Sequence, residues 1–226
     1  QKHPLWNGEL KSGLKFSSVN ADNGFQFYDV DNGQETIDKS QSNDFRYKEQ
    51  ILAGYILYSH SLGDKISMEA GLRGEYTFSD GLLYTIDGDG DENNKRNYIN
   101  LFPTFNLNYQ INDSHALALS YASRIDRPAY QDLNPFEYLL DELSCWKGNP
   151  FLTPQKSHKV ALNYSYNRTA ITASYSYMKD YKAQITDSLS VNKVIMTPRN
   201  IGKQQRVSLT LYQGVNITRW WEMNLN

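Results

Sequence analysis

Three aspartates at alternate positions are the residues of this sequence best suited to chemistry. Asp87, Asp89 and Asp91 are separated by glycines, so their carboxylates can converge on one cation as at the start of a calcium loop. An EF-hand requires a glutamate at loop position 12, and that position, counted from Asp87, is Tyr98. Two interpretations therefore stay open, a calcium site and a solvated acidic loop tip.

The sequence carries no catalytic motif. It has no GxSxG, no P-loop and no Cys/His pair at a known family spacing. Asp141 and Glu142 could exchange protons, but on a predicted loop helix they are interpreted as a solvated face. The single cysteine, Cys145 beside Trp146, is interpreted as a packing residue. We therefore predict a protein that is not an enzyme and has no cofactor, the candidate calcium loop aside.

Composition narrows the fold class. Of the 226 residues, 39% are hydrophobic and 17 are tyrosine, a balance that suits β-strands better than a thick two-sided core. The net charge of −2 comes without a basic block, which argues against nucleic acid as a partner. A membrane-spanning helix is excluded because the most apolar run, Ile51 to Tyr58, is much shorter than about 20 residues. A transmembrane β-strand needs only about 9–11 residues with alternate positions apolar.

Alternation of apolar and polar residues recurs along the chain and predicts about nine strands. From 65 to 77, for example, Ile66, Leu72 and Tyr76 fall on one face, and Arg73 and Glu75 on the other. In the strand from 45 to 61, the odd positions are predicted to form the apolar face; these include Phe45, Tyr47, Ile51, Ala53, Tyr55 and Leu57. The other predicted strands cover 9–18, 100–110, 117–125, 159–166, 171–177, 206–211 and the residues from 221 onward.

The lengths of the connections alternate strictly between long and short. The long connections are 31–43, 80–95, 126–155 and 182–194. All of them must then lie at one end of an up-and-down sheet, as in outer-membrane barrels, which have short periplasmic turns and long extracellular loops. The longest connection is predicted to hold one short helix near 135–146, because Asn134 suits the N-cap, Pro135 the first turn and Gly148 the end.

Several segments together resemble a known family. Arg127 to Phe136 reads RPAYQDLNPF, and Gly148 to Pro154 reads GNPFLTP. Phe45-x-Tyr47-x-Glu49, Ala70-Gly-Leu-Arg-Gly-Glu75, Leu101-Phe-Pro103 and Trp220-Trp221 occur at matching places along the chain. In this order and spacing they are similar to the outer-membrane β-barrel family of TonB-dependent receptors, over about residues 5 to 226.

The resemblance implies an all-β fold, an antiparallel up-and-down transmembrane β-barrel segment. Receptors of this family are similar to 22-stranded barrels with a plugged lumen, so residues 1–226 are expected to be a partial barrel that lacks the plug and the remaining strands. The implied function is uptake of a nutrient across the bacterial outer membrane. The implied partners are outer-membrane lipid, the TonB inner-membrane complex acting through the missing plug, and a surface lipoprotein.

The longest loop is the predicted place of ligand capture. It offers aromatic and cationic side chains at the extracellular mouth, which suit a small molecule, a glycan or a peptide; these are Arg127, Tyr130, Tyr138, Trp146 and Lys147. A rigid cap shaped by prolines is the alternative role for the same loop. A passive porin and a soluble cell-surface β-protein that binds glycan stay open as alternative functions.

Overall fold

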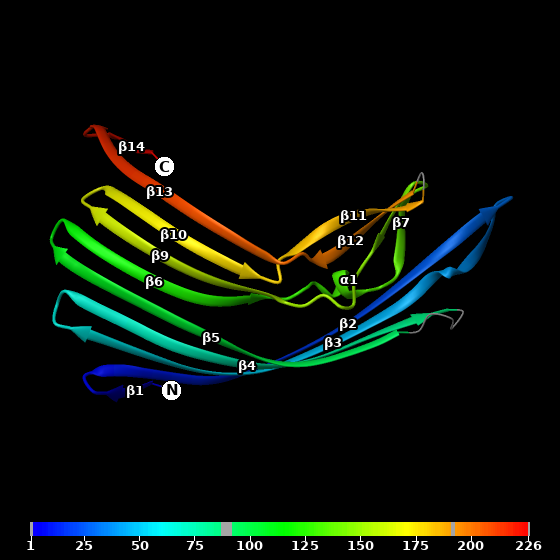
Figure 1. Cartoon of the computed structure of the whole chain (residues 1–226), viewed down its shortest axis with the longest axis horizontal. Helices are drawn as coiled ribbons and strands as arrows, with labels where there is room; N and C mark the ends of the chain where they lie inside the picture. Colours follow the sequence, from blue (N-terminus) through cyan, green and yellow to red (C-terminus); the bar gives the residue numbers. More distant parts are fainter. Residues whose placement is uncertain (1, 87–91, 191–192, 226) are drawn as a thin grey trace.

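Long strands form one curved sheet with tight turns at one end and elaborated connections at the other (Figure 1). The computed structural model describes residues 2–86, 92–190 and 193–225. Within this part of the chain the main sheet has ten strands, in the order β1-β2-β3-β4-β5-β6-β9-β10-β13-β14. Their bounds are β1 (Lys2–Leu5), β2 (Gly8–Asp31), β3 (Gln34–Leu62), β4 (Ile66–Thr85), β5 (Glu92–Asn112), β6 (His115–Asp126), β9 (Gln155–Tyr166), β10 (Thr169–Lys179), β13 (Lys203–Thr218) and β14 (Trp221–Leu225).

The topology is up-and-down, as the sequence predicts. Every pair of neighbours in the main sheet is antiparallel. Nine of its strands correspond to the predicted ones, and β1 is an additional short strand paired with β2. We call the end with the tight turns the turn end and the opposite end the loop end. The predicted long connections all lie at the loop end (Figure 1).

Two of the predicted long loops contain paired strands instead. Residues 182–194 hold β11 (Lys182–Ser190) and the start of β12 (Lys193–Asn200), which pair with each other. Residues 31–43 are not a loop, because β2 and β3 stay paired up to Asp31 opposite Gln34. Asn32 and Gly33 form the turn between them with φ of 50° and 79°. A two-residue Asn-Gly turn with positive φ at both positions matches the twist of a hairpin. The ladder therefore reaches the tip, with one register shift between Phe25 and Phe27.

A second sheet lies at the loop end. It holds β7 (Glu137–Asp141), β8 (Ser144–Lys147), β11 (Lys182–Ser190) and β12 (Lys193–Asn200), in the order β11-β12-β8-β7. The β12–β8 pair is parallel and joins two connections that are far apart in the sequence. The elaborated parts of the loop end therefore support one another.

The helix predicted near 135–146 is wrong. The helix found here is α1 (Tyr130–Leu133), and residues 137–147 form a β-hairpin instead. Asp141 closes the hairpin turn by accepting hydrogen bonds from the Leu143 amide at 2.8 Å and the Ser144 hydroxyl at 2.6 Å. Pairing of β8 with β12 outweighs the helical spacing of the leucines. In the described chain no helix is long and apolar enough to cross a membrane.

The two faces of the main sheet differ in chemistry. Rows of aliphatic and aromatic side chains in register form what we call the apolar face; one such row is Leu119, Leu162, Ala173 and Leu209. The opposite, polar face carries Glu75 and Ser120. This arrangement agrees with the predicted faces of β2, β4, β5, β6, β9, β10 and β13.

The predicted apolar face of β3 is wrong. Ala53 and Tyr55 stand opposite Glu75 and Arg73, on the polar face. The even positions point the other way, and Ile56 is 55% exposed there. Because residues 51–58 are apolar at both parities, periodicity within β3 does not distinguish its faces, and the register with β4 decides.

Residue Leu119 tests the assignment of the faces. If the apolar face meets lipid, Leu119→Arg should lower the free energy of unfolding by about 2–4 kcal/mol. Ser120→Arg, one residue further on, places the same charge on the polar face and should leave stability nearly unchanged. Denaturant unfolding of the barrel in lipid vesicles measures both. Equal losses would contradict the assignment.

Candidate functional site

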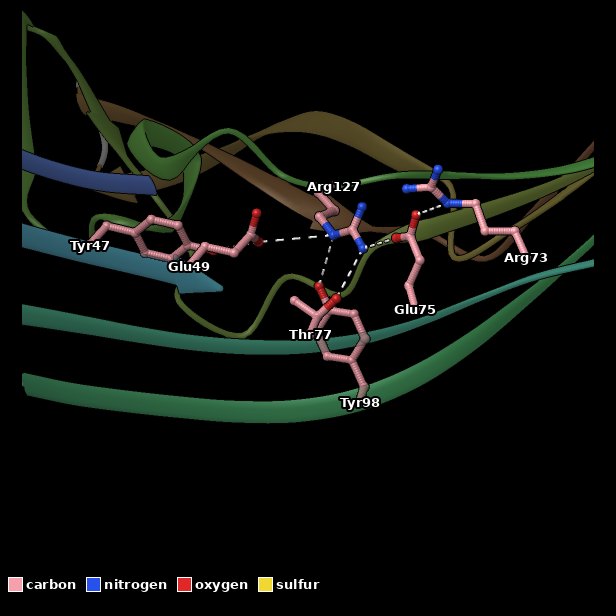
Figure 2. A network of polar contacts seen from close by, with 7 residues as sticks. All are labelled: Tyr47, Glu49, Arg73, Glu75, Thr77, Tyr98 and Arg127. Atoms are coloured by element: carbon pink, nitrogen blue, oxygen red, sulfur yellow. Dashed lines mark hydrogen bonds and ion pairs between the residues drawn. The ribbon is translucent and has the colours of Figure 1, made fainter. Parts of the chain in front are cut away.

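A network of charged and hydroxyl groups ties the longest connection to the polar face (Figure 2). Arg127, directly after β6, donates from Nη2 to Glu75 Oε2 at 2.6 Å and to Thr77 Oγ1 at 3.0 Å. Its Nε donates to the Tyr98 hydroxyl at 3.3 Å and lies 3.9 Å from Glu49 Oε2. One side chain thus contacts β3, β4 and β5.

Burial makes this network more than a surface contact. The side chains of Arg127 and Glu75 are 19% and 7% exposed. The other oxygen of Glu75 accepts a hydrogen bond from Arg73 Nε at 2.6 Å, so each carboxylate oxygen has its own guanidinium donor. A carboxylate this buried would be costly without a partner, and the two arginines supply partners.

The network lies at the point where the pairing between β5 and β6 ends. β5 pairs with β6 from Thr104 to Asn112, and its outer half faces residues of the longest connection instead. Arg96 donates from both terminal nitrogens to the Pro150 and Leu152 carbonyls. Asn94 Nδ2 donates to the Pro150 carbonyl at 2.8 Å. Side-chain hydrogen bonds therefore replace the backbone ladder and fix the connection against the polar face.

The space left between the connection and the sheet is small. Tyr47, Glu49, Tyr98, Arg127 and Pro150 are among the residues around a cavity of about 30 Å³. This volume holds water molecules and is far below the 300–1,000 Å³ of ligand pockets. Arg73, Glu75 and Arg127 also line a larger space of about 460 Å³. The positioning role of the network therefore rests on the contacts that Arg127 makes with three strands.

Local packing within the longest connection is tight. A Cβ on Gly148 would lie 2.2 Å from the Asn134 carbonyl oxygen, so only glycine fits there. The buried Asn134 accepts a hydrogen bond from the Phe136 amide at 3.1 Å and donates to the Tyr138 hydroxyl at 2.6 Å. Asn134 thus holds the chain in an extended path after α1, at the position predicted to begin a helix.

Aromatic side chains gather at the loop end. Tyr138 lies between Phe25, Phe136 and Trp146, with ring centroids at 5.3, 5.4 and 5.8 Å. We call these four residues the loop-end aromatic cluster. Burial raises the pKa of Tyr138 above its ordinary value, which keeps the phenol neutral. Phe25 comes from the tip region of β2, and no local signal in the sequence pointed to it.

The structure separates the predicted ligand residues. Tyr138 and Trp146 are together in the aromatic cluster, whereas Arg127 is engaged in the charged network with Glu75, Thr77 and Tyr98. Tyr130 lies on α1 and is 39% exposed. Lys147 Nζ is 3.5 Å from Glu137 Oε1, with both side chains well exposed. Ligand binding by these residues stays a prediction.

The acidic loop gives no further information. Asp87, Asp89 and Asp91 lie outside the described residues, so the calcium site also stays a prediction. In the rest of the chain, where side chains are described, no group of three or more His, Cys, Asp or Glu is arranged to hold a metal ion.

Apolar and polar faces, an up-and-down topology and long connections at one end are the features of a segment of a bacterial outer-membrane β-barrel. The chain belongs to the outer membrane protein beta-barrel family, which it matches over residues 2–226. It is located in the bacterial outer membrane. A search of curated protein sequences gives no match.

Solved structures with the same fold are receptors and transporters. The copper transporter OprC matches 99% of this chain and 35% of its own length, with 11% identity and a TM-score of 0.74. The siderophore receptor PiuA from Acinetobacter baumannii matches 99% of this chain and 35% of its own length, with 12% identity and a TM-score of 0.64. The ferric yersiniabactin uptake receptor FyuA from Yersinia pestis matches 97% of this chain and 32% of its own length, with 14% identity and a TM-score of 0.60. The chain therefore spans about a third of the length of these proteins and resembles part of a TonB-dependent receptor barrel.

Arg127 tests whether the network positions the loop. Arg127→Met should remove the contacts to three strands and leave Glu75 with one donor. We expect a loss of about 2 kcal/mol, between the values for exposed and buried pairs, and faster amide hydrogen exchange across residues 127–154. Arg73→Met is the matched control, because it also takes a donor from Glu75 but does not belong to the loop. Equal exchange in the two variants would contradict the positioning role.

Proposed function

We propose that this chain forms part of a receptor that takes up a nutrient across the outer membrane. The observation that supports this proposal is the fixed connection at the loop end. Arg127, Arg96 and Asn94 hold residues 127–154 against the polar face, so the mouth presents a built surface. A capture surface is what a receptor needs, whereas a passive porin needs an unobstructed aqueous passage.

The loop-end aromatic cluster is the proposed capture surface. Tyr and Trp provide large rigid contact areas at low cost in conformational entropy, and Trp146 is only partly buried. Tyr130 is exposed at the same end, and the side chain of Lys147 is 42% exposed. The two residues would add a hydroxyl and a cation for an anionic or hydroxylated ligand. Arg127 would contribute indirectly, by holding the loop in place.

Energy coupling is the second part of the proposal. It rests on the resemblance to receptor barrels, and it assigns plug displacement to the TonB inner-membrane complex. The plug and the remaining strands would belong to the whole protein. A surface lipoprotein over the loop end is a further proposed partner.

An uptake measurement tests the proposal against the porin alternative. The solved relatives are described as handling copper and siderophores, so copper, a ferric siderophore and an oligosaccharide form a first panel for the whole protein in cells. We expect saturable uptake of one compound, abolished when the TonB complex is deleted or the proton-motive force is dissipated. Uptake that rises linearly with concentration and needs no energy would establish the porin.

Trp146 tests the capture surface itself. Trp146→Ala should weaken binding of the transported compound to the whole protein about tenfold, as for an aromatic hot spot. The midpoint of thermal unfolding should change little. Trp6→Ala, at the turn end, is the matched control because Trp6 is 83% exposed and far from the mouth. A lower unfolding midpoint with unchanged binding would show that Trp146 only packs the loop.

A further inference from the structure

Three lysines stand side by side on neighbouring strands of the main sheet. Lys179 of β10 is in register with Lys156 of β9 on one side and with Lys203 of β13 on the other. Directly opposite residues in a sheet have Cβ atoms about 4.5–5.5 Å apart, and like charges there are destabilising. We call these three residues the lysine row.

The lysine row belongs to the apolar face. Side chains alternate along a strand, and Lys156 shares its parity with Val160 and Leu162 in β9, where the pairing has no irregularity. Lys179 likewise shares its parity with Tyr175 in β10. All three lysines are exposed. They therefore extend from the side of the sheet that meets lipid.

The row lies at the edge of the lipid. In β9, Tyr166 ends the strand at the turn end and Lys156 is ten positions away, which is about 34 Å along a strand at 3.4 Å per residue. With a strand tilt of about 40°, this gives about 26 Å across the membrane, close to the height of the apolar band. Because long connections of these barrels are extracellular, the row is at the outer boundary.

The neighbouring row combines aromatic and polar groups. His158 and Tyr177 stand opposite each other between the lysine row and the aliphatic rows. The Tyr121 hydroxyl and His158 Nδ1 are 2.9 Å apart. Such amphipathic rings are typical of the headgroup level of a membrane, which agrees with the position calculated for the lysines.

No ion pair within the described residues neutralises the row. At the loop end of the other half of the sheet, by contrast, cations have acidic partners in register. Lys95 Nζ is 3.5 Å from Asp80 Oδ2, and Arg46 Nε is 3.7 Å from Asp22 Oδ1. The acidic residue at the end of β6, Asp126, accepts a hydrogen bond from Gln155. The lysine row is thus an uncompensated block of positive charge.

We propose that the lysine row binds the phosphate groups of lipid A, the anionic anchor of lipopolysaccharide in the outer leaflet. Phosphate complements ammonium groups that would otherwise repel one another. The flexible lysine stems can reach along the apolar surface to the headgroup level. The partner is a lipid because the row faces the membrane at headgroup level. The proposal depends only on the membrane location of the chain. Its failure would therefore leave the proposed nutrient uptake unaffected.

The test measures binding of lipid A to the whole protein in detergent by native mass spectrometry. The double variant K156Q/K179Q removes two charges of the row. K159Q/R206Q is the matched control, because it removes two exposed cations that point to the polar face from β9 and β13, two of the three strands that carry the lysine row. Circular dichroism verifies that each variant is folded.

We expect K156Q/K179Q to bind lipid A about 30-fold more weakly, from the contribution of each lysine near an anionic surface. The control should bind as the unmodified protein does. Lipid A without its phosphates should bind weakly to all three proteins, and inorganic phosphate at millimolar concentration should not displace intact lipid A. Equal weakening by both variants, equal binding of dephosphorylated lipid A, or displacement by inorganic phosphate would each overturn the proposal.

Discussion

Hydrocarbon offers a polypeptide no hydrogen-bond partner, and this constraint decides the form of the chain. Each backbone group in a spanning strand must pair with a neighbouring strand, so the strands are long and antiparallel. The ladder between β3 and β4 runs without a break from Asn43 to Leu62. Alternation along such strands then separates an apolar face from a polar one, and the longest connection is fixed against the polar face.

The network around Arg127 arises where the backbone ladder stops. The residues of β5 before Thr104 have no pairing with β6. Side-chain hydrogen bonds fix the loop there instead. Arg96 and Asn94 bind loop carbonyls, and Arg127 reaches the buried Glu75. A charge in such a place is tolerated only when it is paired, so the loop that supplies Arg127 is held in one position. This gives the mouth of the barrel a defined surface.

Charge is distributed differently over the two halves of the loop end. In the half formed by β2 to β5, cations such as Lys95 alternate with carboxylates in register, and the surface is locally neutral. Across β9, β10 and β13 the same positions bring lysines together on the apolar face. The cations of the first arrangement have carboxylate partners within the protein, whereas we propose that those of the second bind an anion. In our two proposals, the lysine row gives the barrel wall a specific contact with the membrane, and the loop end gives it a surface for a ligand.

The sequence by itself determined the strands that have one polar face, because these show a local periodicity. It also determined their order and the end that carries the long connections, because these depend on connection length. Only the tertiary structure decided that Ala53 and Tyr55 of β3 lie on the polar face, since residues at both parities of that strand are apolar. It also decided the hairpin at 137–147, where pairing of Cys145 with Ile195 outweighs helical spacing. Arg127 was singled out from the sequence, but its partners lie on strands far away along the chain. Long-range pairing leaves no periodic signal in one strand, so only the folded chain reveals it.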